Sequence, residues 1–241
     1  MTRGAEWGSF LDVRTNAAES YAANVDRERR FAHERGRPFT IFLSSSTDPF
    51  VPQEQRYHIT RSVLETMLDS PPDTLILQTH SHRLVDYLEL YRALAQVCNV
   101  RIHLSIETDR DRIPGLPNHA SSVDGRFKAA AQLKQAGLNV VITVSPLLPI
   151  ADPEQFFARV AECANAVVLD HFIGGDGSSD GSRTRRTELV PAMAALEPTS
   201  VELSYRDEMA EIALRHLPGR VGVHTAGFAG RFEKGISAFD S

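Results

Sequence analysis

Short apolar stretches alternate with longer amphipathic ones along most of this chain. The apolar stretches have the length of β-strands, and the amphipathic ones repeat apolar positions with the spacing of a helix. We expect strands over residues 39–43, 74–79, 101–107, 140–145, 166–171 and 221–224. We expect helices over residues 16–34, 59–68, 84–97, 124–136, 153–163, 187–196 and 206–217.

Regular alternation of strand and helix predicts a parallel sheet. A sheet covered by helices on both faces would have continuous Val/Ile/Leu strands. The segment 101–107 alternates instead, with Ile102, Leu104 and Ile106 on one face and His103, Ser105 and Glu107 on the other. One face therefore packs on helices, and the other becomes polar toward the carboxyl ends of the strands. This pattern predicts an α/β protein with a partial TIM-type barrel that opens into a ligand pocket.

Composition sets broad limits on what the chain does. With 241 residues and 42% hydrophobic content it can form one sizeable core. The net charge of −5 gives no sign of a nucleic-acid surface. Without a bilayer-length apolar run or a signal peptide, we expect a cytoplasmic protein with no membrane partner. We divide it into a charged helical segment (1–36) continuous with the barrel, the barrel itself (37–230) and a tail (231–241).

The two cysteines, Cys98 and Cys163, lie far apart in the sequence and lack the spacing of metal ligands. We expect both to be reduced thiols packed as small apolar groups.

Polar side chains gather where the predicted strands end. They are Ser46, Thr47 and Asp48, then Gln78 and His80, then Ser105 and Glu107, then Ser145, and finally Asp170 and His171. Such a ring suits a zwitterionic ligand with several hydroxyls. Arg126, on the helix after Glu107, either meets a ligand carboxylate or pairs with Glu107. Two plainer alternatives stay open: the Ser/Asp run caps the next helix, and Arg126 is an exposed helix residue.

A metal-dependent hydrolase is a further alternative. His80 and His82 form an H-x-H pair at a strand end, and His171 follows a later strand. Neutral imidazoles with a carboxylate bind Zn²⁺ and acidify a water. However, an intact βα unit precedes this pair, whereas barrel hydrolases carry it on the first strand. The chain also lacks G-x-G-x-x-G and P-loop motifs.

Several of these segments resemble radical SAM proteins, most closely the spore photoproduct lyase-like branch. The matching stretches lie in order at strand ends and cover about residues 8 to 230. They are Ser46-Thr47-Asp48-Pro49-Phe50-Val51-Pro52-Gln53-Glu54, Ile59-Thr60-Arg61, Ile76 to Ser81, Leu104 to Asp109, the helix Arg126 to Leu133 with Gly137, and Val144 to Pro149.

The resemblance implies a partial (β/α)6 barrel that binds S-adenosylmethionine and a 4Fe–4S cluster. In complete family members the cluster cleaves the sulfonium to a 5′-deoxyadenosyl radical, for lyase or repair chemistry. By the matching motifs, Ser46, Thr47 and Asp48 would hold the methionine amine. Ser105, Glu107 and Arg126 would meet the ribose or carboxylate, Ser145 would lie near the adenosyl group, and Gln78 belongs to the same set. The substrate and the oligomeric state stay open.

One part of the family pattern is missing. The cluster is held by C-x-x-x-C-x-x-C after the first barrel strand, and this chain has neither the motif nor a third cysteine. The first βα unit is thus expected to be absent, with no metal ligand among the residues. Of two explanations we favour an N-terminally truncated sequence. The other is a cluster-less paralogue that binds a ligand without catalysis.

Overall fold

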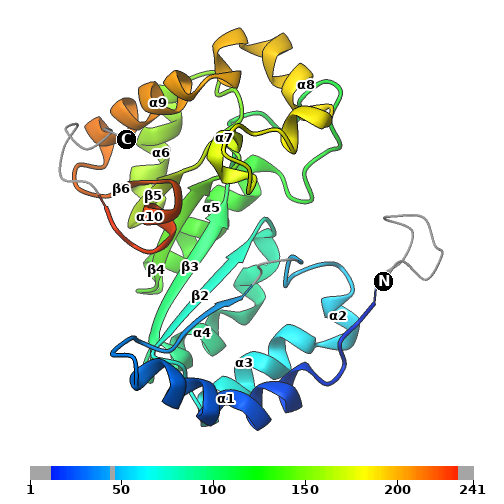
Figure 1. Cartoon of the computed structure of the whole chain (residues 1–241), viewed down its shortest axis with the longest axis vertical. Coiled ribbons are helices and arrows are strands. Elements are labelled where there is room, and N and C mark those ends of the chain that lie inside the picture. The colour runs from blue at the N-terminus through cyan, green and yellow to red at the C-terminus, as the bar shows by residue number, and fades with distance from the viewer. Residues whose placement is uncertain (1–11, 44–46, 233–241) are drawn as a thin grey trace.

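A six-stranded sheet forms the centre of the computed structural model, which describes residues 12–43 and 47–232 (Figure 1). All neighbouring strands are parallel, in the order β1 to β6. The strands are β1 (Thr40–Leu43), β2 (Thr74–Thr79), β3 (Asn99–Ser105), β4 (Asn139–Val144), β5 (Ala166–Leu169) and β6 (Val221–Val223). The predicted α/β class and the partial barrel of parallel strands are confirmed.

The long helices also follow the prediction. They are α1 (Ala17–His33), α3 (Ile59–Asp69), α4 (Leu88–Leu94), α5 (Val123–Gln135), α6 (Pro153–Cys163), α8 (Leu189–Leu196) and α9 (Leu203–His216). Short elements were not foreseen: α2 (Glu54–Tyr57), α7 (Phe172–Gly175), α10 (His224–Phe228), and the 3-10 turns η1 (His82–Tyr87), η2 (Thr184–Arg186) and η3 (Pro198–Val201). The helix expected over 84–97 is split, because Tyr87 leaves helical geometry at the boundary between η1 and α4.

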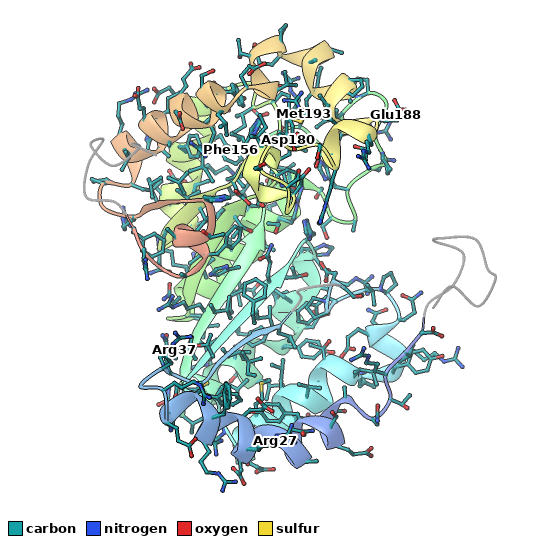
Figure 2. All side chains as sticks on the ribbon, in the orientation of Figure 1. Arg27, Arg37, Phe156, Asp180, Glu188 and Met193 are labelled. Carbon is teal, nitrogen blue, oxygen red and sulfur yellow. The ribbon has the colours of Figure 1, made fainter. Side chains whose placement is uncertain are left out.

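The outward face of the sheet and the helices form the main core. Six strand side chains on this face are less than 1% exposed: Leu75, Leu77, Ile102, Leu104, Val140 and Ile142. Phe156 and Phe157 of α6 join the same core, and Figure 2 labels Phe156 in the upper part of the molecule. The alternation predicted for 101–107 is therefore confirmed on its apolar side.

The opposite, inward face is partly covered by α10. Phe228 and Phe232 pack there on Val141 and Val168 of β4 and β5. The backbones of β6 and α10 touch closely, since a Cβ built on Gly222 would lie 2.5 Å from the Cα atom of Gly227. Glycine is required at this contact because any side chain would push α10 off the sheet.

A second, smaller core lies beyond the carboxyl ends of the strands, in the upper part of Figure 1. It joins Ile113 of the loop after β3 to Phe172 of α7 and Met193 of α8, which Figure 2 labels. These segments follow β3 and β5, so they border the edge of the sheet where the polar side chains were predicted.

The N-terminal helix α1 packs on α3, and the Tyr21 hydroxyl donates a 2.6 Å hydrogen bond to the Ser70 carbonyl. The boundaries proposed at residues 36 and 230 stay predictions. Among the helices described, none combines the length and the apolar character that crossing a bilayer requires.

Candidate functional site

Three charged side chains form a chain of contacts at the carboxyl ends of β2 and β3. His80 Nε2 lies 2.9 Å from one carboxylate oxygen of Glu107. The Nη1 atom of Arg126 donates to the other oxygen and to the Ser105 carbonyl, at 2.7 Å each. The side chains of Arg126 and Glu107 are 1% and 5% exposed, whereas that of His80 is 48% exposed. Arg126 is therefore a buried partner of Glu107, and the exposed-residue alternative is wrong.

These contacts fix the charges of the site. Burial by itself raises the pKa of Glu107, but the contact with His80 and the charge of Arg126 outweigh it and lower that pKa to about 2. The carboxylates of Asp48 and Glu107 raise the pKa of His80 to about 9, against the opposing effect of burial. At neutral pH the site thus holds an imidazolium and a guanidinium facing two carboxylates.

The raised pKa of His80 predicts a pH-dependent stability. The pairing of protonated His80 with the two carboxylates stabilises the fold fully when the pH is below the ordinary imidazole pKa of 6.5. This stabilisation is lost as the pH rises through about 9, the pKa of His80 in the fold. Because half of the side chain is exposed, we expect solvent screening to limit the loss to about 1 kcal/mol. Urea unfolding of the wild type and of His80→Gln between pH 6 and pH 9.5 measures it. The free energy of unfolding of the variant should lack this decline with pH. An equal decline in both proteins would contradict the stabilising pairing of His80 with the carboxylates.

Asp48 anchors the loop after β1. Its carboxylate accepts hydrogen bonds from the backbone N–H groups of Phe50 and His80, both at 2.8 Å, and from the hydroxyl of Thr79 at 2.8 Å. Burial raises the pKa of Asp48, but the bonds from His80 and Phe50 hold it below its usual range. The oxygens predicted to hold an amine are thus largely engaged within the protein, and this role stays a prediction.

The remaining predicted residues are distributed along the inward face. Gln78 Nε2 lies 3.4 Å from the Ser105 hydroxyl, which is 3.0 Å from that of Thr143. Ser145 contacts Asp170 at 3.5 Å. Ser46 lies outside the described residues. The structure therefore brings together Gln78 with Ser105, and Glu107 with Arg126, from the predicted set.

A cavity of about 460 Å³ adjoins this site beside β1. Thr47 and Asp48 line it, together with Phe42 of β1, Tyr57 of α2 and Thr60 of α3. Its size is that of a small-molecule pocket, and its wall is mainly apolar with a few polar groups. Asp48 borders both this cavity and the His80–Glu107 contact, so a ligand in the cavity would lie next to the charged site.

The three imidazoles of the hydrolase alternative each have other partners. His80 contacts carboxylates, and His82 Nδ1 lies 2.9 Å from the hydroxyl of Ser121. His171 is buried, with Nε2 3.0 Å from the Ser200 carbonyl and Nδ1 accepting from the Ile173 N–H. Within residues 12–43 and 47–232, no three His, Cys, Asp or Glu side chains are arranged to hold a metal ion. The geometry therefore gives this alternative no support.

Sequence reasoning missed the part played by Glu54. This buried carboxylate accepts from the first N–H groups of α3, at Thr60 and Arg61, and from the hydroxyl of Tyr87. It fixes α2 and α3 against η1 and forms part of the cavity wall. The signal was available, because Glu54 ends the first stretch that resembles the radical SAM proteins.

Both cysteines lie at the end of the sheet opposite the charged site. Cys98 directly precedes β3, and Cys163 is the last residue of α6 before β5. Burial raises the pKa of both thiols, that of Cys163 to about 11. Both are free, Cys163 buried and Cys98 partly buried, as predicted. Two separated, protonated thiols do not fit the ligand set of a 4Fe–4S cluster.

Solved structures of spore photoproduct lyase, a radical SAM enzyme, share this fold. A cysteine-to-alanine mutant with dinucleoside spore photoproduct matches at a TM-score of 0.54 and 15% identity, over 83% of this chain and 65% of the lyase. A tyrosine-to-phenylalanine mutant gives 0.53 at 15% identity, over 83% and 64%. This chain thus spans about two thirds of the lyase's length. No family model and no curated protein matches it.

Proposed function

We propose that this protein binds S-adenosylmethionine at the carboxyl edge of its sheet. The observation that carries the proposal is the contact chain of His80, Glu107 and Arg126, on a fold of the radical SAM type. Asp48 contacts His80 and also lines a ligand-sized cavity, so the charged site and the cavity adjoin.

A sulfonium amino acid with a ribose carries two positive charges, one carboxylate and several hydroxyls. Such a ligand needs carboxylates, donors and hydroxyls from one site. Glu107 supplies a carboxylate, and His80 and Arg126 supply donors. The hydroxyls are those of Thr47 and Thr60 in the cavity wall.

Arg126 provides the structural test of this fit. Its Nε and Nη2 groups are buried and have no hydrogen-bond partner among the described residues. Buried donors of this kind are rare, because an unpaired group costs free energy. A ligand carboxylate or ribose oxygen, or an ordered water, would pair them. Glu107 accepts from Nη1 and so fixes the orientation of the guanidinium.

The radical chemistry of the family is not assigned to these residues. It requires electrons from a 4Fe–4S cluster, and the two cysteines of the sequence do not fit one. We therefore limit the proposed function to ligand binding and orientation. The dinucleoside bound by the lyase is not carried over either, since a chain of net charge −5 gives no independent support for DNA.

Calorimetric titration of the full chain with S-adenosylmethionine tests the proposal. We expect saturable binding, with adenosine alone binding more weakly because it lacks the charged groups. Glu107→Gln should weaken S-adenosylmethionine binding roughly tenfold, which corresponds to about 1.4 kcal/mol. Gln78→Ala should weaken it less, since this side chain makes only one long bond.

The control for this titration is Glu154→Gln, which neutralises an exposed carboxylate of α6 that pairs with Arg215 and His216. Its affinity should equal that of the wild type. Thermal melting of each variant establishes that it is folded before titration. Absence of saturable binding up to about 1 mM, the weakest affinity of interest, would refute the proposed function.

A further inference from the structure

Asp170 and His224 form a second imidazole–carboxylate pair at the carboxyl edge, outside the contact chain of His80. His224 Nδ1 lies 2.9 Å from Oδ1 of Asp170. The carboxylate side chain is 11% exposed and the imidazole 40% exposed. A carboxylate that accepts from Nδ1–H fixes the proton on that nitrogen and leaves the lone pair on Nε2. Within the described part of the chain, Nε2 has no hydrogen-bond partner.

This arrangement differs from the other pairs of the same kind. In His33–Asp73 and His216–Glu154 the carboxylate contacts Nε2, and both partners lie on the surface. In His80 both ring nitrogens face carboxylates, at 3.6 and 2.9 Å, so neither is available to a ligand. Among these pairs, His224 combines a buried carboxylate on Nδ1 with a 40% exposed ring whose Nε2 has no hydrogen-bond partner among the described residues.

The register of the sheet places this pair beside the charged site. Ser105 is paired with Thr143, and Val144 with Leu169. Glu107 lies two residues beyond Ser105, Ser145 directly follows Val144, and Asp170 directly follows Leu169. If the register is continued past the strand ends, these three residues form a row. Because adjacent strands are about 4.8 Å apart, Glu107 and Asp170 are separated by roughly 10 Å. A ring-sized ligand at this edge would reach both.

The local backbone is built closely around the pair. A Cβ on Gly175 would lie 2.7 Å from Oδ2 of Asp170, and one on Gly174 would lie 3.3 Å from Cε1 of His224. His224 itself has a φ of 54°, in the left-handed region that residues other than glycine adopt at a cost. A contact serving only to attach α10 to β5 would not require a strained histidine with an unpartnered nitrogen.

We propose that His224 is a general base for a ligand bound at this edge and that Asp170 is its positioning residue. The ligand class is one with a weakly acidic hydroxyl or ring N–H. The O–H or N–H bond breaks, its electron pair stays on the ligand heteroatom, and the proton bonds to Nε2. The Asp170 carboxylate stabilises the resulting imidazolium. Ser145 contacts Asp170 and not the imidazole, so the group is not a serine nucleophile triad. The inference rests on the proposed function in that the ligand bound at this edge is taken to be S-adenosylmethionine.

Nitrogen NMR of the full chain labelled with ¹⁵N-histidine tests the geometry. The neutral form of His224 should carry its proton on Nδ1 in the wild type. In Asp170→Asn the amide can donate to Nδ1, so the proton should move to Nε2. Glu154→Gln, the matched change at His216, should leave His224 unaffected. A proton on Nε2 in the wild type would overturn the inference, and this readout does not depend on the variants folding.

Diethyl pyrocarbonate, which acylates unprotonated imidazole nitrogens, tests the reactivity of Nε2. Peptide mapping should show His224 modified in the wild type and modified roughly tenfold more slowly in Asp170→Asn. Bound S-adenosylmethionine should protect His224. If it binds by calorimetry without protecting His224, the proposed base does not face the ligand and the inference fails. If it does not bind, the proposed function fails and with it the ligand assigned to this base, while tautomer and reactivity still decide whether Asp170 positions His224.

Discussion

Arg126→Met should lower the free energy of unfolding by about 3–5 kcal/mol, the effect expected when one partner of a buried ion pair is removed. Methionine has a similar length and preserves most of the packing, so the loss isolates the electrostatic contribution. The carboxylate of Glu107 would keep only the contact with half-exposed His80, and the Ser105 carbonyl would lose its donor. Urea unfolding at pH 7 measures the change.

A double-mutant cycle makes this result specific. Glu107→Gln combined with Arg126→Met replaces the buried pair by neutral groups, and should recover much of the loss because no unpaired charge remains. Arg92→Met, which removes an exposed pair with Glu89, should cost less than about 1 kcal/mol. A loss no larger for Arg126→Met than for Arg92→Met would show that the pair does not stabilise the site.

Gly222→Ala should destabilise the protein by about 1–3 kcal/mol, the cost of overpacking a close contact. The new methyl group would lie 2.5 Å from the Cα atom of Gly227 and 3.2 Å from the carbonyl oxygen of Arg231. Both are backbone atoms, which cannot rotate away as a side chain could. Relief requires α10 to move away from the inward face. Phe228 would then lose its contact with Val168, and His224 its contact with Asp170.

Amide hydrogen exchange over residues 224–230 measures that displacement alongside urea unfolding. Exchange should accelerate there in the variant while the strands exchange as in the wild type. Gly36→Ala is the comparison, since a Cβ at that glycine meets no atom within 4 Å and only its φ of 64° is strained. Equal exchange over residues 224–230 in Gly222→Ala and Gly36→Ala would rule out a steric role for Gly222.

The fold was largely predictable because its signals are local. Helix α6 has the bounds 153–163 that its apolar spacing predicted, with Asp152 as cap and Pro153 at the first turn. Alternation along β3 predicted which face meets the helices. Helix α10 escaped prediction because a five-residue helix spans little more than one helical turn, too short for its apolar spacing to repeat. Its position depends on contacts with β5 and β6.

The site was predictable in part. Parallel strands place all their carboxyl ends at one edge, so the sequence indicated that Gln78, Ser105 and Glu107 lie near one another. It did not indicate how their polar atoms are used. Asp48 has its oxygens engaged by Phe50, Thr79 and His80, through backbone geometry that no spacing rule describes.

The amino-acid sequence by itself determined the order of strands and helices, the polar edge of the sheet and the absence of a cysteine set for a cluster, because each depends on residue type and short-range spacing. Only the tertiary structure decided the partners. Arg126 reaches Glu107 across 19 positions, and Asp170 meets His224 across 54. Such pairs depend on strand register and on how α5 and α10 pack against the sheet, and those long-range contacts leave no periodic trace in the chain.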